Sequence, residues 1–299
     1  MIPLISIVTL TYKKFDSIYE TIQSVLDQDQ PQIEYIISDD GSAGFPREEI
    51  EEYIRRNKKE NVVSVKILTV EKNTGTVRNI NRAYKAAAGK YILNLSADEV
   101  FTETDTVGKI LREMEEHGCE VLVTRRIVCS EAGDFLGYLP KVKNIGRIKK
   151  LDTPLLQHKA FLTDEFYDMA SGSVLCVRKD TIEAMGWFDE NYVLWEDGPF
   201  FSKYTKKALI HTDYDIVSIR YKLGGVSNSG TNPLMDVDYK RYNAVERCED
   251  LSDLDTITRM KIDYICQRDL AETRNERIKL YLKNPAVMFL KVLYKIRNS

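Results

Sequence analysis

Three pairs of neighbouring acidic residues stand out in this chain: Asp39-Asp40, Asp98-Glu99 and Glu196-Asp197. The first two pairs follow apolar, β-branched runs, and the third follows a tryptophan and precedes a helical segment. Carboxylate oxygens among small residues suit Mg²⁺ or Mn²⁺ shared with a diphosphate. A carboxylate in a partly apolar pocket can act as a general base. Each pair alone also has a plain structural interpretation, because acids are common in turns and at the first turn of a helix.

The segments around the first two pairs alternate between strand and helix. Apolar runs predict strands at residues 4–11, 33–38, 62–70 and 91–95. Amphipathic segments predict one helix that starts with a capping box at Ser17, one at 46–56, and one at 77–88 with Gly89 as its stop signal. This order predicts right-handed crossovers and a Rossmann-like open α/β sheet, in which ligands bind at the carboxyl ends of the strands.

These strand ends are expected to bring a group of polar residues to one rim. The candidates for nucleotide binding are Thr9, Thr11, Tyr12, Asp39, Asp40, Arg78 and Ala97, and the candidates for metal binding are Asp98 and Glu99. Tyr12 can stack on a base, and Asp39 can accept hydrogen bonds from a base or a ribose. The rim therefore predicts a site for a nucleotide diphosphate and a divalent cation.

The second half of the chain continues the mixed pattern. Strands are predicted at 121–128, 173–177, 208–212 and 216–221, and helices at 104–117, at a short segment capped by Asp180, at 199–207 and from about Met235 onward. The basic stretch 141–150 has no clear periodicity and predicts a mobile loop. His117, His158 and His211 are far apart in sequence, and we interpret them as helix-end, loop and strand residues rather than as metal ligands.

Composition argues against several classes of protein. The 299 residues carry a net charge of −3, which argues against a nucleic-acid partner. The five cysteines are scattered and form no C-x-x-C pair, so we expect neither a disulfide framework nor a zinc cluster, and a cytoplasmic location fits best. We find no signal peptide, no bilayer-spanning apolar run, and none of the motifs G-x-G-x-x-G, G-x-x-x-x-G-K-[ST], H-E-x-x-H and G-x-S-x-G.

Five motifs, in order, resemble those of the family 2 glycosyltransferases, inverting enzymes of GT-A fold that use nucleotide-diphosphate sugars. They are Ile5-Ser6-Ile7-Val8-Thr9, Ser38-Asp39-Asp40-Gly41-Ser42, residues 73–79 with Ala88-Gly89-Lys90-Tyr91-Ile92, Ser96-Ala97-Asp98-Glu99, and Trp195-Glu196-Asp197. The resemblance implies a GT-A type, Rossmann-like mixed sheet flanked by helices, with a C-terminal helical appendage. It implies a catalytic domain at 1–230, with a nucleotide-binding half at 1–100 and an acceptor half at 101–230, followed by a helical region at 231–299.

The resemblance also implies roles for individual residues. Asp197 is expected to be the general base, with Glu196 beside it in the catalytic pair. Asp98 is expected to hold Mn²⁺ or Mg²⁺, with Glu99 assisting. The acceptor is expected to contact Gly172, Ser173 and Trp195. The implied donor is a UDP-sugar, although no residue excludes a thymidine nucleotide, and the implied acceptor is a glycan or a lipid-linked oligosaccharide, as in bacterial surface polysaccharide synthesis.

The sequence departs from the family pattern at three places. Ser96 replaces the first acid of the D-x-D motif, the span from Gly75 to Arg78 is short, and residues 221–227 contain no histidine. A noncatalytic nucleotide-sugar-binding protein therefore stays open as an alternative. A sugar nucleotidyltransferase fits less well, because Thr11-Tyr12-Lys13-Lys14-Phe15 contains no glycine, and a glycoside hydrolase would not need a nucleotide rim.

The C-terminal segment 274–299 is basic, with seven Lys and Arg residues and one acid. Asn284-Pro285 opens a predicted helix over 284–297. Its apolar residues share one face: Ala286, Phe289, Leu290, Leu293 and Ile296. This pattern is typical of a helix lying on anionic lipid, so we expect peripheral contact with the inner face of the cell membrane. Packing on the catalytic domain and a homodimer contact are the alternatives.

Overall fold

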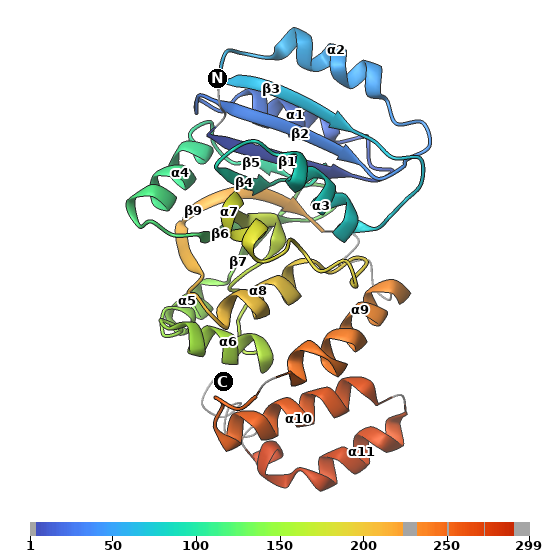
Figure 1. The fold of residues 1–299 in the computed structure, drawn as a ribbon, viewed down its shortest axis with the longest axis vertical. Helices are drawn as coiled ribbons and strands as arrows, with labels where there is room; N and C mark the ends of the chain where they lie inside the picture. Colours follow the sequence, from blue (N-terminus) through green and yellow to red (C-terminus); the bar gives the residue numbers. More distant parts are fainter. Residues whose placement is uncertain (1–3, 224–231, 250, 272, 290–299) are drawn as a thin grey trace.

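The computed structural model describes residues 4–223, 232–249, 251–271 and 273–289. A nine-stranded sheet occupies one end of the long axis in Figure 1, and helices from the C-terminal part of the chain occupy the other end. The strand order is β3-β2-β1-β4-β8-β6-β9-β5, and β7 pairs with β6. The strands are β1 (Ile5–Thr11), β2 (Ile33–Asp39), β3 (Val62–Leu68), β4 (Tyr91–Asn94), β5 (Val100–Phe101), β6 (Val121–Cys129), β7 (Phe135–Leu139), β8 (Leu175–Arg178) and β9 (His211–Lys222).

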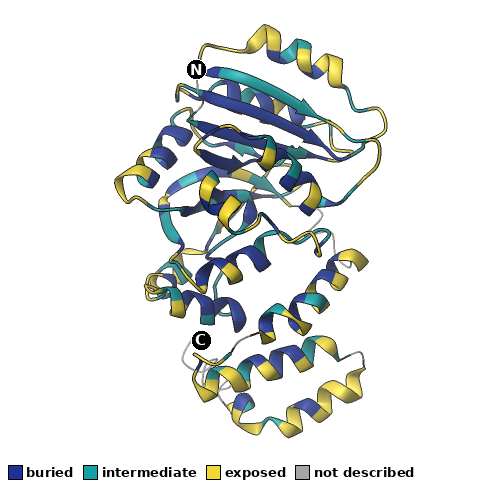
Figure 2. Cartoon of the chain, in the orientation of Figure 1, coloured by how far each residue is buried: buried dark blue, intermediate teal, exposed yellow. Residues whose placement is uncertain are grey.

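The first four strands are parallel, as predicted. Thr11 of β1 lies opposite Asp39 of β2, and Val8 of β1 lies opposite Asn94 of β4, so these strands end at the same edge of the sheet. The Ile and Val side chains of β1 and β2 are buried in one core with α1 (Ile18–Leu26), α2 (Arg47–Asn57) and α3 (Thr76–Ala86) (Figure 2). The predicted Rossmann-like first half, with its polar rim, is therefore confirmed.

The second half makes the sheet mixed. β8 is antiparallel to both β4 and β6, and β9 is parallel to β6. The two strands predicted at 208–212 and 216–221 form the single strand β9, whose register against β6 shifts near Arg125. β5 and β7 were not predicted. The helix predicted at 104–117 is confirmed as α4 (Thr106–Glu116).

Several local predictions were wrong. The Ser17 hydroxyl donates to the carbonyl of Ala97 (3.3 Å) and does not cap α1. Gly89 does not end a helix, because α3 already ends at Ala86. A glycine is needed there because the backbone packs closely against β1, and an added Cβ would lie 2.5 Å from the backbone nitrogen of Ser6. The predicted basic loop contains a helix, α5 (Val142–Ile148). The short helix α7 (Lys179–Ala184) is preceded by Arg178, with Asp180 inside its first turn and not at the cap.

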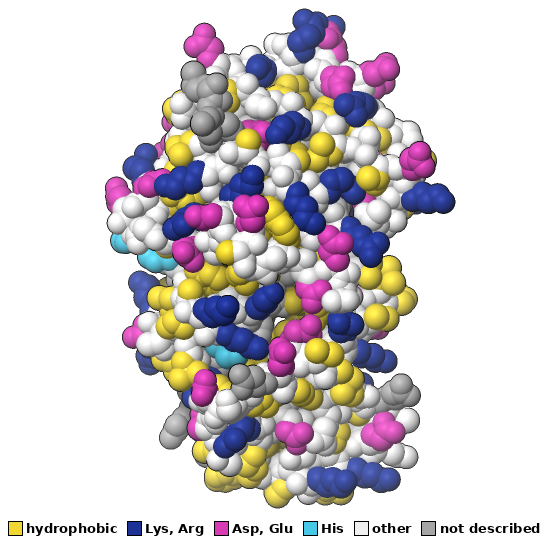
Figure 3. All heavy atoms as spheres, viewed as in Figure 1, with side chains coloured by type: hydrophobic (Ala, Val, Ile, Leu, Met, Phe, Trp, Pro, Cys, Tyr) yellow, Lys and Arg dark blue, Asp and Glu magenta, His cyan; other side chains and the backbone are white. Residues whose placement is uncertain are grey.

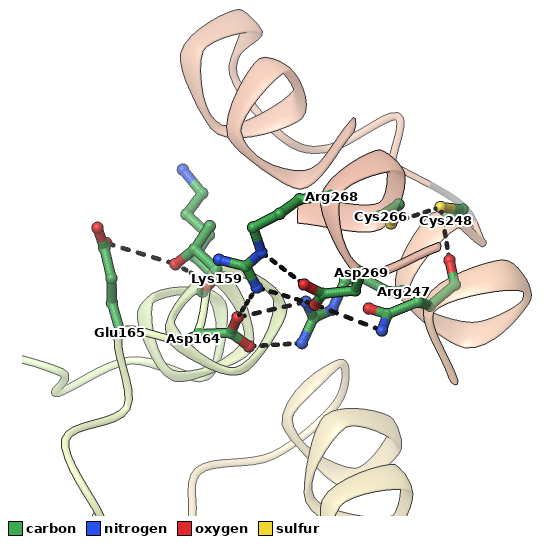
Figure 4. Close-up of polar contacts among 10 residues, drawn as sticks. Lys159, Asp164, Glu165, Arg247, Cys248, Cys266, Arg268 and Asp269 are labelled. Carbon is green, nitrogen blue, oxygen red and sulfur yellow. Dashed lines mark hydrogen bonds and ion pairs between the residues drawn. The ribbon is translucent and has the colours of Figure 1, made fainter. Parts of the chain in front are cut away.

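Five further α-helices among the described residues complete the second half and the C-terminal region. They are α6 (Pro154–Leu162), which holds His158 and was not predicted, α8 (Asp197–Thr205), α9 (Pro233–Ala244), α10 (Thr256–Leu270) and α11 (Arg274–Lys283). Arg247 joins the C-terminal helices to the core, because its guanidinium lies 2.5 Å from Asp164 and 3.8 Å from Asp269 (Figure 4). In the same region the sulfur atoms of Cys248 and Cys266 lie 3.0 Å apart as free thiols.

The helix expected to touch the membrane is described only in part, because residues 290–297 lie outside the described ranges. Residues 285–289 are helical, and Val287 packs against Tyr264 and Ile265 of α10. Phe289 is 64% exposed. In the part of the chain that the structure describes, no helix is both long enough and apolar enough to cross a bilayer.

Candidate active site

Asp39, the last residue of β2, is buried at the strand-end rim. Its Oδ2 accepts a hydrogen bond from the backbone N–H of Ser42 (2.8 Å), whereas its Oδ1 is buried and finds no partner among the described residues. A buried acceptor without a donor is costly, so this oxygen is suited to a ligand N–H or O–H. Tyr12 follows β1 at the same rim and is 38% exposed, with Nζ of Lys13 5.0 Å from the centre of its ring.

The two threonines of β1 are occupied within the protein. The hydroxyls of Thr9 and Tyr35 share a hydrogen bond (3.0 Å), and the Thr11 hydroxyl donates to the carbonyl of Lys14 (3.2 Å). Both threonines are buried. Their side chains therefore hold the strand end in place, and the expectation that they contact the nucleotide directly is not supported by their hydrogen bonds.

Asp40 holds a neighbouring turn. One or the other of its carboxylate oxygens accepts the backbone N–H of Thr74 (3.0 Å), the Thr74 hydroxyl (2.6 Å) and the N–H of Gly75 (2.8 Å). Arg82 of α3 approaches the same carboxylate (3.4 Å), whereas the predicted Arg78 is largely exposed and pairs with Glu190 (3.6 Å). The cation at this part of the rim is therefore Arg82, one helical turn after Arg78, and Asp40 shapes the site indirectly.

The Asp98-Glu99 pair divides into an outer and an inner acid. The Asp98 carboxylate is 18% exposed and lies 2.6 Å from Nζ of Lys14. Glu99 is buried and accepts the backbone N–H of Ser96 (2.8 Å), and burial together with the charge of Asp98 raises the pKa of Glu99 to about 8. Ala97, which precedes Asp98, is buried as well. Asp98 alone therefore offers a carboxylate to a cation at the rim, and the expected assistance from Glu99 does not fit this inward orientation.

Asp197, the first residue of α8, is held by two backbone N–H groups. Gly172 donates to its Oδ2 (2.7 Å) and Gly198 donates to its Oδ1 (2.7 Å). Asp197 lies at the N-terminus of α8, where backbone N–H groups interact favourably with a carboxylate. Burial, followed by the charges of Asp197 and Asp238, raises the pKa of Glu196. Asp197 is therefore fixed in position beside an acid whose pKa is raised.

Asp238 of α9 fixes the turn that leads to this pair. Its carboxylate is buried and accepts the backbone N–H groups of Val193, Leu194 and Trp195 at 2.7–3.1 Å. Asp238 could not be singled out from the sequence, since it lies outside the motifs and no local pattern marks it. The C-terminal helices thus take part in shaping the candidate active site.

A cavity of about 880 Å³ lies beside Asp197 and between the core and the C-terminal helices. Trp195 lines it, and the Trp195 ring lies 4.4 Å from that of Tyr239 and 5.1 Å from that of Tyr242. This position requires Gly198, because an added Cβ would lie 2.1 Å from the Trp195 ring. Of the residues expected at the acceptor, Trp195 faces the cavity, Gly172 holds Asp197, and the Ser173 hydroxyl accepts a hydrogen bond from Arg126 (3.3 Å).

Contacts connect the Asp98 region with the Asp197 region. The side-chain amide of Asn94, at the end of β4, donates a hydrogen bond to the carbonyl of Gly172 (3.4 Å). The backbone N–H of Gly172 donates in turn to the Asp197 carboxylate. Arg126 lies between the two regions, since it bonds Ser173 and its charge opposes the rise of the Glu99 pKa. The two regions therefore adjoin, although Asp98 is not among the residues that line the cavity.

Several known proteins are similar to this chain in sequence or in structure. TuaG of Bacillus subtilis, a glycosyltransferase named for teichuronic acid biosynthesis, is 32% identical over 131 residues, which are 44% of this chain and half of TuaG. The crystal structure of S. aureus TarS 1-349 in complex with UDP-GlcNAc superposes with a TM-score of 0.61 at 17% identity, covering 93% of this chain and 89% of TarS 1-349. The mannosyltransferase PcManGT of Pyrobaculum calidifontis, solved with GDP-Man and Mn²⁺, has a TM-score of 0.60 at 12% identity, covering 99% of this chain and 81% of PcManGT.

These structural neighbours share the GT-A-like fold that the resemblance implied. The matched segment of the sequence decides the family. Residues 6–171, more than half of the chain, match the glycosyl transferase family 2, and they contain all but the first residue of β1, the whole of β2 and the Asp98 region. The chain therefore belongs to glycosyl transferase family 2.

Proposed function

We propose that this chain transfers a sugar from a UDP-sugar to a hydroxyl of a glycan or a lipid-linked oligosaccharide, with inversion at the anomeric carbon, in surface polysaccharide synthesis. The family, the name of TuaG and the UDP-GlcNAc complex of TarS support this donor and acceptor class. The observation that carries the proposal is the Asp197 carboxylate, which two backbone N–H groups hold beside the 880 Å³ cavity.

In the proposed reaction, Asp197 accepts the proton of the acceptor hydroxyl as the hydroxyl oxygen bonds to the anomeric carbon. The bond between that carbon and the diphosphate oxygen breaks on the opposite face, so the configuration inverts. The N–H groups of Gly172 and Gly198 fix the carboxylate, and a neutral Glu196 avoids a second negative charge beside it. A positioned base of this kind contributes about 10²–10⁴-fold to the rate.

The nucleotide is proposed to bind at the ends of β1 and β2. The unpartnered Oδ1 of Asp39 can accept an N–H of the base, and the exposed ring of Tyr12 can stack on it. Uracil carries a ring N–H between two carbonyl groups, which matches one carboxylate oxygen as acceptor. Thr9 and Thr11 are assigned to supporting this strand end.

The rim also fits a divalent cation, Mn²⁺ or Mg²⁺, held by Asp98. This carboxylate attracts positive charge, since the ammonium group of Lys14 lies 2.6 Å from it. Because Ser96 replaces one acid and Glu99 faces inward, the remaining oxygen ligands would come from the diphosphate and water. When bound, such a cation supplies positive charge to the departing diphosphate. Lys14 can add to that charge.

The acceptor is proposed to bind in the 880 Å³ cavity. Its aromatic residues Phe166, Trp195 and Tyr239 offer flat apolar faces to sugar rings. Its carboxylates, among them Asp236 and Asp269, can accept hydrogen bonds from sugar hydroxyls. The cavity therefore suits a chain of linked sugars with one hydroxyl presented to Asp197.

Calorimetric titration with UDP and with GDP, each with and without Mn²⁺, tests the donor. We expect UDP to bind more tightly with Mn²⁺, and the Asp39→Asn variant to bind UDP about 10- to 100-fold more weakly, because it loses a hydrogen bond to a charged group. The exposed Asp263→Asn variant is the control and should bind UDP like the wild type. Equal affinities for UDP and GDP, or UDP binding by Asp39→Asn as tight as that of the wild type, would contradict the assignment of Asp39 to a uracil site. The anomeric configuration of the product, read by NMR, tests inversion.

A further inference from the structure

Glu113, His117 and His211 form a second cluster of ligand-type side chains. Glu113 and His117 are one turn apart at the end of α4, and His211 is the first residue of β9. Oε1 of Glu113 lies 2.6 Å from Nε2 of His211 and 3.2 Å from Nε2 of His117. One ligand atom from each of the three residues lies within 4.8 Å of the other two. The fold thus brings together two histidines that lie far apart in the sequence and that we did not expect to act as metal ligands.

This cluster lies at the opposite end of the sheet from the strand-end rim. β4 and β6 run in the same direction, because β8 is antiparallel to both, and β9 is parallel to β6. His211 pairs with Leu122 near the start of β6, whereas Asp98 follows the end of β4. Figure 3 shows histidine side chains together on the surface beside the end of α4. The cluster is therefore separate from the proposed donor site.

We propose that Glu113, His117 and His211 bind a divalent transition-metal ion, with Zn²⁺ as the best match. Two imidazoles and one carboxylate form a donor set that zinc accepts in proteins, whereas Mg²⁺ and Mn²⁺ favour sites richer in carboxylate, carbonyl and water oxygens. Tetrahedral zinc with bonds of about 2.1 Å needs ligand atoms about 3.4 Å apart. The observed separations of 2.6 and 3.2 Å need to change by less than about 1 Å, which side-chain rotations provide.

The exposure of the three residues is compatible with entry of an ion. The side chains of Glu113, His211 and His117 are 19%, 28% and 50% exposed, so solvent reaches the cluster and can fill the remaining coordination position. The ion ties the end of α4 to the start of β9, two segments 98 residues apart along the chain. Without an ion, Nε2 of His211 is hydrogen-bonded to Oε1 of Glu113, and Nε2 of His117 lies 3.2 Å from the same oxygen.

Calorimetric titration of the EDTA-treated chain with ZnCl₂ tests the proposal. The protein for this titration is prepared without a histidine tag and with the substitution Cys248→Ser, because the adjacent thiols of Cys248 and Cys266 also attract zinc. We expect one Zn²⁺ per chain, an affinity at least tenfold lower in His211→Ala and in His117→Ala, and a visible absorption band of bound Co²⁺ that both variants lose. Using two histidine variants protects the test if one fails to fold.

Two controls separate this site from others. Glu116→Gln, an exposed acid on the same helix, and Asp98→Asn, at the proposed donor site, are both expected to bind Zn²⁺ like the starting chain. No zinc binding, or equal binding by folded His117→Ala and His211→Ala variants, would overturn the proposal. Loss of zinc binding in Asp98→Asn would overturn it too, since the ion would then belong to the donor site.

Discussion

Replacing Asp238 by asparagine removes the charge that holds the turn before the catalytic pair. The carboxylate accepts three backbone N–H groups, those of Val193, Leu194 and Trp195, at 2.7–3.1 Å. A hydrogen bond to a charged group contributes about 1.5–3 kcal/mol and a neutral one about 0.5–1.5 kcal/mol. Three losses of about 1 kcal/mol each lower the free energy of unfolding by about 3 kcal/mol. Asparagine also has one acceptor oxygen, so at least one N–H faces its amide group.

Thermal melting and transfer kinetics measure these two effects of Asp238→Asn. The melting temperature should fall by about 5–10 °C. The kcat/KM for transfer should fall at least about tenfold, because a displaced turn misplaces Asp197, whereas UDP affinity should stay unchanged. Asp236→Asn, an exposed acid on the same helix, is the control for melting temperature. A variant that melts and turns over like the wild type would refute the reasoning. A destabilised variant with full turnover would refute the positioning role alone.

Two further predictions concern the residues beside Asp197. In Gly198→Ala the new methyl group would lie 2.1 Å from the Trp195 ring, so the transfer rate should fall at least about tenfold. The control is Gly146→Ala on α5, where an added Cβ meets nothing within 4 Å, and this variant should transfer sugar like the wild type. Equal transfer rates for the wild type and both variants would contradict this prediction. The second prediction concerns Glu196, whose pKa is raised above its ordinary 4.5, so that the folded state keeps a proton that the unfolded chain releases. As the pH rises from about 5 to about 9, the melting temperature of the wild type should therefore fall relative to that of Glu196→Gln. A difference in melting temperature that does not change with pH would count against the raised pKa.

The parallel half of the sheet could be predicted because its strands are continuous apolar runs. β2 is buried along its whole length and β1 at every position but Leu10, and such runs separated by amphipathic helices specify a parallel α/β layer. β5 has two residues, and β7 is largely exposed, so neither carries a local hydrophobic pattern. The continuity of β9 depends on pairing with β6 across a register shift, which no local window of sequence contains.

The candidate site could be predicted where chemistry follows a strand or opens a helix, as for Asp39, Asp98 and Asp197. The direction in which a side chain points could not be predicted, so the inward orientation of Glu99 was missed. Contacts between segments that are distant in the sequence could not be predicted either, because no local pattern links them. Asp238 contacts a turn more than 40 residues earlier, and the Glu113 and His211 side chains meet across 98 residues.

The most direct test of the account compares sugar transfer by the wild type and by Asp197→Asn at saturating donor and acceptor. We predict a rate about 10²–10⁴-fold lower in the variant, because asparagine cannot accept the acceptor proton, together with UDP affinity within about twofold of the wild type. Transfer by Asp197→Asn at the wild-type rate, with UDP bound equally well, would contradict the assignment of Asp197 as the base.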